Sequence, residues 1–374
     1  MPEAFVALAD LLRARPLAAR LVDDEPDAEP VGPVGADASQ ERRTRARLAY
    51  PCGFGRAFDG DGASLDDGPP VRIAFGPLDP PGLSERVAPE DVAWTGVRAI
   101  DGLLALARGA RIGIFGAPGT GKSSLLDAIA RGTDADALVV GLVGERGREA
   151  ETWLRRLDAR TTLVCATSDR AAGERIRACE SAFAHASALR ARGLHVLLVI
   201  DSIARYANAL RETALASGEA SGRGGFPPSV FARLARAVEC AGATPHGSVT
   251  LIATVLDDGD DRDPVSDAAR SLLDGHVALC PRIARAGRFP AVDVLASASR
   301  TMDLVAGPAH RAAAARVRAA LARLAAGAEA RALGLAPADA AERPVEAFLR
   351  QGPLPERPAA TLAFLGEVAD NLPE

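Results

Sequence analysis

The chain contains a single lysine, Lys122, whereas its other 43 basic residues are arginine. This lysine lies in an octapeptide that matches the pattern G-x-x-x-x-G-K-[ST]. That pattern is typical of the P-loop, a glycine-rich loop whose backbone N–H groups bind phosphates. A lysine ammonium is a compact point charge that fits between β- and γ-phosphates, whereas a guanidinium is a wide planar fork. The pattern therefore predicts a nucleoside triphosphate site made of Gly116, Ala117, Pro118, Gly119, Thr120, Gly121, Lys122, Ser123 and Ser124.

The residues around this loop have the pattern of a strand that leads into a helix. Arg111–Phe115 is apolar enough for a buried strand, and residues 123–130 suit a helix. Phosphates in such a loop rest on the helix N-terminus, where N–H groups and the helix dipole favour negative charge. Ser123 is expected to offer its hydroxyl to Mg²⁺. The alternative, a chance glycine-rich turn, is disfavoured by this strand–loop–helix setting.

A carboxylate follows a second apolar run. His195-Val-Leu-Leu-Val-Ile-Asp201 has the pattern of a buried strand that ends in an acid. In a parallel sheet the carboxyl end of that strand lies beside the P-loop, so Asp201 is expected to hold the Mg²⁺ shell together with Ser123. Strands that end in aspartate are common, and it is the P-loop that makes this signal specific.

A second acidic segment, Gly144-Glu-Arg-Gly-Arg-Glu149, lies between the glycine-rich loop and Asp201 in the sequence. It again follows a strand pattern. A carboxylate there can orient and polarise an attacking water, a role worth ~10²–10⁴ in rate for a general base. We predict that Glu145 has this role, with Glu149 as the second candidate. The alternative is a solvated, charged loop.

Apolar runs alternate with helical stretches through the middle of the chain. This order predicts an α/β fold with a parallel sheet and crossover helices. After Asp303 the composition turns to strong helix formers, as in 309–333, so a small helical domain is expected to end the chain. The predicted strands are 111–115, 137–143, 161–165, 195–200, 249–255 and 291–295.

The N-terminal region has a different composition. Residues 2–14 carry an apolar stripe at helical spacing, which suits either a helix packed on its own domain or a docking helix for a partner. Residues 22–41 are acidic and unpatterned and are expected to be disordered or a loose loop. Asp-Gly turns within 45–75 predict one or two hairpins, and a proline-rich linker follows.

Composition limits the class of protein. The net charge of −5 and the pI of about 5.7 provide no bulk attraction to nucleic acid. No apolar run of 18 residues and no signal pattern occur, so a cytoplasmic protein is expected, one that could dock on a membrane through a partner. The five cysteines lack metal-ligand spacing and are expected to be free thiols: Cys52, Cys165, Cys179, Cys240 and Cys280.

Several motifs, in order, resemble those of the type III secretion and flagellar protein-export ATPases, which are relatives of the rotary ATP synthase catalytic subunits. The likeness is strong over about residues 94–305 and weaker in the helical C-terminal region. Besides the P-loop, the segments that carry it are Thr95–Leu104, Gly144–Glu149, Ile200–Ala207, Gly225–Phe231, Ser271–His276, Phe289–Arg300 and Pro344–Gln351. The Phe289–Arg300 block points to the export branch.

The resemblance implies roles for individual residues. Lys122 corresponds to the phosphate lysine, Ser123 and Asp201 to the Mg²⁺-binding pair, and Glu145 to the catalytic carboxylate with Arg146 beside it. Arg300 resembles an arginine finger that reaches the γ-phosphate of a neighbouring subunit, a device worth roughly 10³–10⁵ in rate. Phe289 stands where the family stacks an aromatic ring on adenine. The alternatives are a core phenylalanine and one more surface arginine.

The resemblance also implies an architecture and partners. It predicts a P-loop core of the RecA and rotary-ATPase type at 94–305, a reduced N-terminal β region at 1–93 and a C-terminal helical domain at 306–374. Stretches 53–60 and 64–68 resemble the last hairpin of the family's N-terminal β-barrel, whose earlier strands are not evident. The expected assembly is a homohexamer with stator and stalk proteins, exported proteins and their chaperones, at the inner face of the cytoplasmic membrane.

Three functional hypotheses follow. The first is an ATP-hydrolysing export motor that uses Mg²⁺. The second is a rotary-ATPase subunit or an RNA translocase with a similar core, although the acidic pI argues against RNA. The third is a non-catalytic, ATP-binding assembly factor.

The acidic loop 257–263 fits a solvated turn better than a Ca²⁺ site, because its spacing fails the EF-hand pattern. In the family this loop faces the central channel of the ring, so contact with a stalk or substrate is the other interpretation. The residues alone leave both readings of the loop open.

Lys122→Arg should be almost as damaging to nucleotide affinity as Lys122→Ala, since it keeps the charge but changes the shape. The measurement is the dissociation constant for ATP of the two variants and the unchanged protein. Near-normal affinity in the arginine variant would contradict the prediction.

Overall fold

The computed structural model describes residues 55–68, 77–257, 263–335 and 337–373. The predicted helix at 2–14, the acidic stretch at 22–41, most of the 45–75 hairpin region, Cys52 and most of the acidic loop lie outside these ranges. Among the described cysteines all four are free thiols, three of them buried and Cys280 half-buried. None of the described helices is long and apolar enough to cross a membrane.

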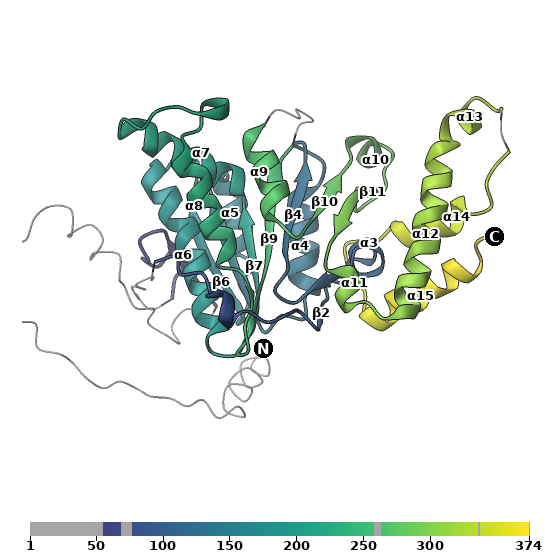
Figure 1. The fold of residues 1–374 in the computed structure, drawn as a ribbon, viewed down its shortest axis with the longest axis horizontal. Helices are drawn as coiled ribbons and strands as arrows, with labels where there is room; N and C mark the ends of the chain where they lie inside the picture. Colours follow the sequence, from purple (N-terminus) through teal and green to yellow (C-terminus); the bar gives the residue numbers. More distant parts are fainter. Residues whose placement is uncertain (1–54, 69–76, 258–262, 336, 374) are drawn as a thin grey trace, which may run out of the picture.

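The centre of the fold is a mostly parallel sheet (Figure 1). Neighbouring strands pair in the order β1-β6-β5-β7-β9-β4-β10-β11, and all of these pairs are parallel except β10–β11. Short β8 (Gly242–Ala243) pairs with β9 in the antiparallel sense. The strands are β1 (Arg56–Asp59), β4 (Arg111–Gly116), β5 (Ala137–Val143), β6 (Thr161–Ala166), β7 (His195–Asp201), β9 (Ser248–Leu256), β10 (Gly275–Leu279) and β11 (Val292–Ser299).

The predicted parallel sheet with crossover helices is confirmed. All six predicted strands are present, and β10 is an additional strand that the sequence pattern did not indicate. Continuous apolar runs such as Ala137–Val143 form strands because both faces of the sheet are covered by helices. Alternate residues then enter two separate cores, with Val140 and Leu142 on one face and Val139 and Val143 on the other.

Different helices cover the two faces. One core is shared with α6 (Ala172–Arg190), α7 (Ile203–Ala216) and α8 (Pro228–Glu239), which gather at the left of Figure 1. The other core is shared with α3 (Arg98–Leu103), α4 (Lys122–Gly132) and α5 (Gly147–Leu154). A separate pair, β2 (Val92–Ala93) with β3 (Leu106–Ala107), flanks α3.

The expected turn at the first Asp-Gly pair is present in the described part of the N-terminal region. The chain turns back after Asp59, where the Asp59 N–H donates to the Ala63 carbonyl and an antiparallel bridge joins Phe58 to Ser64. Residues 56–59 also form β1, which pairs in parallel with β6 at the edge of the main sheet, Arg56 lying opposite Thr162, a pairing that the sequence pattern did not indicate. Burial favours this pairing. The Phe58 side chain is fully buried at the sheet edge, a position that a separate hairpin would not provide.

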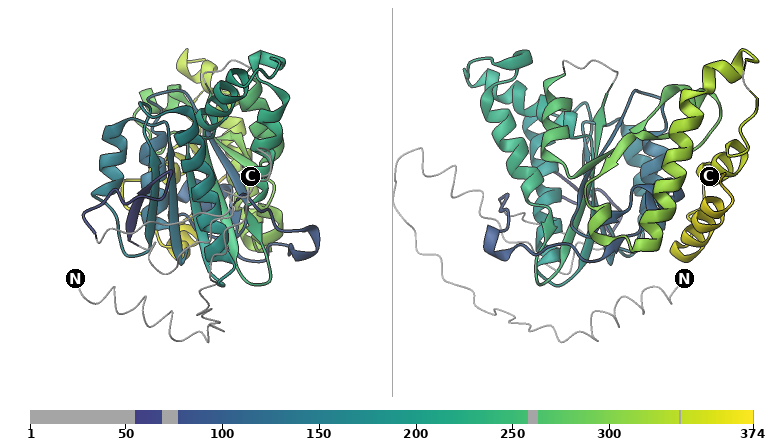
Figure 2. Two further views of the ribbon diagram at one scale, coloured as in Figure 1. Left: turned by 90° about the vertical axis from the view of Figure 1, so that its left-hand side faces the viewer. Right: turned by 45° about the vertical axis from the view of Figure 1, so that its right-hand side comes forward.

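The predicted C-terminal helical region is confirmed. It comprises α12 (Pro308–Ala326), α13 (Ala328–Ala332), α14 (Glu342–Leu349) and α15 (Pro358–Asp370), after the short α11 (Met302–Val305). Figure 2 shows these helices packed beside the sheet domain. Phe348 and Leu365 are buried against Gly102 of α3, where a Cβ would lie 2.7 Å from the Phe348 ring. One hydrophobic core therefore joins the C-terminal helices to the sheet domain.

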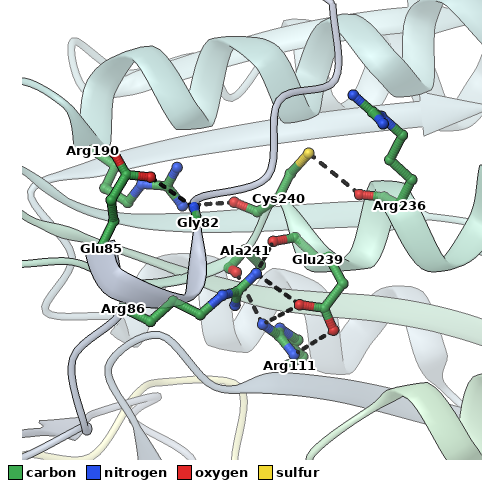
Figure 3. A network of polar contacts seen from close by, with 9 residues as sticks. All are labelled: Gly82, Glu85, Arg86, Arg111, Arg190, Arg236, Glu239, Cys240 and Ala241. Carbon is green, nitrogen blue, oxygen red and sulfur yellow. Dashed lines mark hydrogen bonds and ion pairs between the residues drawn. The ribbon is translucent and has the colours of Figure 1, made fainter.

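The segment before β2 is fastened to the end of the sheet that lies away from the P-loop (Figure 3). Arg86 forms an ion pair with Glu239 at 2.7 Å, and Arg111 at the start of β4 binds the same carboxylate at 3.0 and 3.1 Å. Arg236 donates to the Leu78 carbonyl, at 3.2 and 3.0 Å. The described part of the linker thus lies against α8 and the β8–β9 turn. The remaining short helices are η1 (Leu83–Glu85), η2 (Arg223–Gly225), α9 (Pro264–Leu272) and α10 (Pro281–Arg285).

Candidate nucleotide-binding site

The P-loop joins β4 to α4 as predicted. β4 ends at Gly116, the loop follows, and α4 begins at Lys122. Two glycines adopt left-handed backbone conformations, Gly119 at φ +80° and Gly121 at φ +95°. Residues with a Cβ atom rarely adopt these conformations. A Cβ at Gly119 would have no neighbour within 4 Å, so the tip of the loop is open. The loop is therefore shaped for a ligand at the N-terminus of α4.

The Lys122 side chain turns back on its own loop. Its Nζ donates to the Gly116 carbonyl at 2.6 Å and to the Ala117 carbonyl at 3.0 Å. Burial lowers the pKa of the Lys122 ammonium, and the nearby carboxylates of Asp201, Glu145 and Glu149 offset part of that effect. The ammonium therefore rests on carbonyl oxygens at the position from which it can turn to phosphate oxygens.

Asp201 ends β7, two strands away from β4 in the sheet. It is buried, and one carboxylate oxygen accepts a hydrogen bond from the Thr254 hydroxyl of the intervening β9. Burial raises the pKa of the Asp201 carboxyl, and the Thr254 bond and the Lys122 charge oppose this shift. Parallel pairing brings this carboxylate to the same sheet edge as the P-loop, as predicted.

Glu145 follows β5 and is only 8% exposed. It forms an ion pair at 2.7 Å with Arg205 of α7, whose helix begins directly after Asp201. Burial, with the Asp201 charge second, raises the pKa of Glu145 to about 7, while Arg205 opposes the shift. A carboxyl that titrates near neutral pH suits proton transfer.

The other two residues of this loop lie differently. Glu149 lies in the first turn of α5 and lines the cavity described below, so it stays a second candidate for the base. Arg146 precedes α5 and is exposed, and within the described ranges its side chain forms no ion pair. Its predicted catalytic role stays a prediction.

The oxygen donors suit Mg²⁺. The protein offers the exposed Ser123 hydroxyl and the Asp201 carboxylate, while no cluster of three or more metal-binding side chains occurs among the described residues. Mg²⁺ is commonly held by one or two protein oxygens together with phosphates and waters. The residues present therefore fit a Mg²⁺ ion that arrives with a nucleotide.

A cavity of about 810 Å³ opens beside the P-loop. It is lined by Thr120, Gly121, Ser123 and Ser124 of the loop and helix, by Trp153 and Glu149 of α5, and by Phe289. Phe289 is 49% exposed, so it is not a core residue. Its ring lies 3.9 Å from the position of a Cβ on Gly121. An exposed aromatic ring next to a phosphate loop is suited to stack on a base.

The loop between α14 and α15, which contains Gln351, also lines the cavity and lies beside Phe289. The Gln351 backbone N–H donates to the Phe289 carbonyl at 2.9 Å. Its side-chain oxygen accepts from the Arg98 N–H at 2.8 Å, and its Nε2 donates to the Gly96 and Leu354 carbonyls at 2.8 and 3.0 Å. Gln351 therefore joins the aromatic wall to the sheet domain.

Asp101 holds the segment that contains Gly96, the residue of the sheet domain that Gln351 contacts. Its buried carboxylate accepts from the Thr95 N–H, the Thr95 hydroxyl and the Gly96 N–H at 2.7–2.9 Å. Burial raises the pKa of Asp101 to about 7, although these three donors oppose the shift. Gly96 thus presents its carbonyl to Gln351 from a rigid segment.

Sequence reasoning missed Arg205, Gln351 and the cavity wall of α4 and α5. Arg205 lies four residues after Asp201, a spacing that places it on the first turn of the following helix. Gln351 ends the motif Pro344–Gln351, which was recognised only as a resemblance and carried no role. The cavity wall has no motif, since Asp127 and Arg131 of α4 meet Trp153 and Arg156 only in the folded chain, where Asp127 forms ion pairs with both arginines.

Arg300 lies away from the P-loop of its own chain. It follows β11, and its N–H donates to the Asp274 carbonyl, while the Asp274 N–H donates to the Arg111 carbonyl at the start of β4. The P-loop leaves the other end of β4. The exposed Arg300 lines a second cavity of about 270 Å³ together with Arg86, Arg108 and Arg111.

Comparison with known proteins gives a consistent result. Residues 96–299 match the model of the ATP synthase alpha/beta family, nucleotide-binding domain. A type 3 secretion system ATPase of Pseudomonas syringae pv. tomato is 45% identical over 280 residues, which is 71% of this chain and 61% of that protein. A flagellum-specific ATP synthase of Salmonella typhimurium is 45% identical over 271 residues, covering 70% and 59%. The chain thus spans about three fifths of these relatives.

Solved structures agree with the sequence comparison. A prototypical ATPase from the type III secretion system of pathogenic bacteria aligns with a TM-score of 0.76 and 38% identity, over 84% of this chain and 97% of that one. The assembled ATPase EscN from enteropathogenic E. coli aligns with a TM-score of 0.80 and 38% identity, over 85% and 82%. The predicted resemblance to export ATPases and the predicted fold class are therefore confirmed.

Gln351→Ala should raise the KM for ATP about tenfold and leave kcat within about twofold, because it removes three hydrogen bonds that hold the base-side wall. Steady-state kinetics measures both constants. Asn371→Ala is the matched control, since that amide donates only within its own C-terminal helix. An unchanged KM would contradict the role of Gln351.

Proposed function

The chain belongs to the ATP synthase alpha/beta family, and from this premise we propose that it is a Mg-ATP-hydrolysing motor of a type III secretion or flagellar export apparatus. The observation that carries the proposal is the set of groups at one sheet edge. Lys122, Asp201 and the Glu145–Arg205 pair surround the P-loop beside a cavity with an exposed aromatic ring. Within one chain this arrangement offers the phosphate-binding lysine, a Mg²⁺ ligand and a carboxylate that can orient water, three of the groups that phosphoryl transfer to water uses.

Each residue has a distinct role in this proposal. Lys122 leaves its two carbonyl partners and binds β- and γ-phosphate oxygens. Ser123 and Asp201 would hold Mg²⁺, which would supply charge neutralisation at the phosphates. Glu145 orients the attacking water and accepts its proton, and Arg205 holds the carboxylate in place.

The arginine finger is proposed to act between subunits. The side chain of Arg300 lies at the end of β4 that is remote from its own P-loop, so within one chain it does not serve that site. A ring would bring it to the neighbouring cavity. The assembled state named for the similar EscN structure supports an oligomer, which we propose to be a homohexamer. Arg146 is proposed to assist beside Glu145.

We also infer partners and a cellular location for this protein from its relatives in the family. EscN has been solved with its central stalk EscO, which supports a stalk protein as a partner here. We infer further partners in stator proteins, exported proteins and their chaperones, no nucleic acid partner, and a cytoplasmic position at the inner face of the membrane. The division into residues 1–93, 94–305 and 306–374 is retained as part of the proposal.

Steady-state hydrolysis of ATP tests the function. The protein should hydrolyse ATP with activity that rises cooperatively with protein concentration, whereas Glu145→Gln should bind ATP normally and turn over ~10²-fold more slowly or worse, because the amide cannot accept a proton. The rate should also fall as the pH drops below about 7, where Glu145 takes up a proton.

Two results would contradict this assignment. No hydrolysis at any protein concentration would favour the non-catalytic assembly factor. Normal turnover in Glu145→Gln together with loss in Glu149→Gln would move the role of base to the second carboxylate. Binding of ATP to both variants is the control for folding.

Arg300→Ala should reduce hydrolysis steeply and ATP binding little, since the finger stabilises charge that develops in the transition state. Mixing Arg300→Ala with Glu145→Gln supplies some interfaces with both residues intact, so mixtures should regain activity that neither variant has alone. The mass of the mixture shows whether mixed oligomers form. Mixed oligomers without regained activity would contradict action between subunits.

A further inference from the structure

The base of the P-loop is joined to the end of the neighbouring strand. We call Phe115 and Gly116, the last residues of β4, the P-loop root. β4 and β9 pair in parallel, with Gly116 opposite Leu256, so the two segments that follow these strands leave the sheet side by side. The N–H of the next residue, Asp257, donates to the Gly116 carbonyl at 3.3 Å. That carbonyl also accepts from Lys122 Nζ at 2.6 Å.

Arg270 of α9 contacts both sides of this junction. Its guanidinium forms an ion pair and hydrogen bond with the Asp257 carboxylate. It also lies over the ring of the buried Phe115, with 4.3 Å between the guanidinium carbon and the ring centroid. The Phe115 ring is also held by His276 of β10, against which it packs edge-on with 5.9 Å between the ring centroids.

We propose that Arg270 is a positioning residue that holds the P-loop root while Lys122 moves from the loop carbonyls to the phosphates of ATP. The proposal rests on the nucleotide site proposed above. The Gly116 and Ala117 carbonyls occupy two of the three N–H donors of the Lys122 ammonium, so binding both a β- and a γ-phosphate oxygen requires the release of at least one carbonyl. The Asp257 N–H then remains as the donor to Gly116, and Arg270 keeps Asp257 and Phe115 in register with each other.

We infer that the P-loop root stays in place while the tip of the loop moves. The tip at Gly119 has open space around it and a backbone that only glycine readily adopts, so it can close on phosphates. A root that moved with the tip would carry the Gly116 carbonyl along with the ammonium and keep the two bonded. Fixing the root therefore favours release of Lys122 to the ligand.

The same helix provides a matched control. Arg223 forms an ion pair with Asp267 of α9 at 3.0 Å, with both side chains more than half exposed, and neither contacts the P-loop root among the interactions described. Removing the Arg223–Asp267 pair shows how the loss of any ion pair on α9 affects nucleotide binding. Removing the Arg270–Asp257 pair shows the additional effect of releasing the P-loop root.

The experiment compares ATP with AMP, which lacks the phosphates that Lys122 binds. The readout is the fluorescence of Trp153, which lines the cavity, in a Trp94→Phe background. Arg270→Met keeps an apolar stem on Phe115 but removes the charge, so the dissociation constant for ATP should rise about fivefold and that for AMP should stay within about twofold. Arg223→Met should change neither.

Two further variants test whether Arg270 acts through Asp257. Asp257→Asn should also weaken ATP relative to AMP, and the double variant with Arg270→Met should be no weaker than Arg270→Met alone, since residues that act as one unit are not additive. Arg270→Lys, which keeps the charge, should recover part of the ATP affinity.

Three results would overturn the proposal: an unchanged ATP affinity in Arg270→Met, an equal loss for ATP and AMP, or the same loss in Arg223→Met. Failure of the proposed function is recognised separately. If the unchanged protein binds ATP without hydrolysing it, the motor is rejected, while the comparison of ATP with AMP still decides the role of Arg270.

Discussion

Parallel pairing of β4, β9, β7 and β5 is the constraint on which the site depends. Because parallel strands end at the same sheet edge, the P-loop, Asp201 and Glu145 meet there although about 85 residues separate the first from the last along the chain. The apolar strands tolerate this arrangement because helices bury both faces.

The charges at this edge interact with one another. Glu145, Glu149 and Asp201 surround one ammonium, and burial raises the pKa of two of these carboxyls, Glu145 and Asp201. Arg205 forms an ion pair with Glu145, and its charge also opposes the raised pKa of Asp201. A bound nucleotide with Mg²⁺ would reorganise this balance, because the metal draws the carboxylate of Asp201 and the phosphates draw Lys122. The site is thus polarised before the ligand arrives.

The second wall of the cavity depends on contacts across the chain. Gln351 reaches Gly96 and Arg98, more than 250 positions earlier, and positions Phe289 through its backbone. Nothing in the local pattern of residues 342–370 predicts this, since a helix–loop–helix pattern describes only the local chain. β1 shows the same limit. Its Asp-Gly turn indicates the antiparallel turn that residues 57–65 form, but that local pattern does not predict the parallel pairing of β1 with β6, where Phe58 is buried. β10 was missed because its buried and half-buried residues alternate over only five positions.

The sequence by itself determined the P-loop, the acids that end β7 and follow β5, the order of the strands along the chain and the helical C-terminal region. Those features follow from local causes, namely glycine backbone freedom, apolar periodicity and helix propensity. Only the tertiary structure decided that Arg205 pairs with Glu145, that Gln351 closes the cavity and that Arg300 lies at the far end of β4 from its own P-loop. These depend on which strands pair and which surfaces pack, and such long-range contacts leave no periodic signal in the chain.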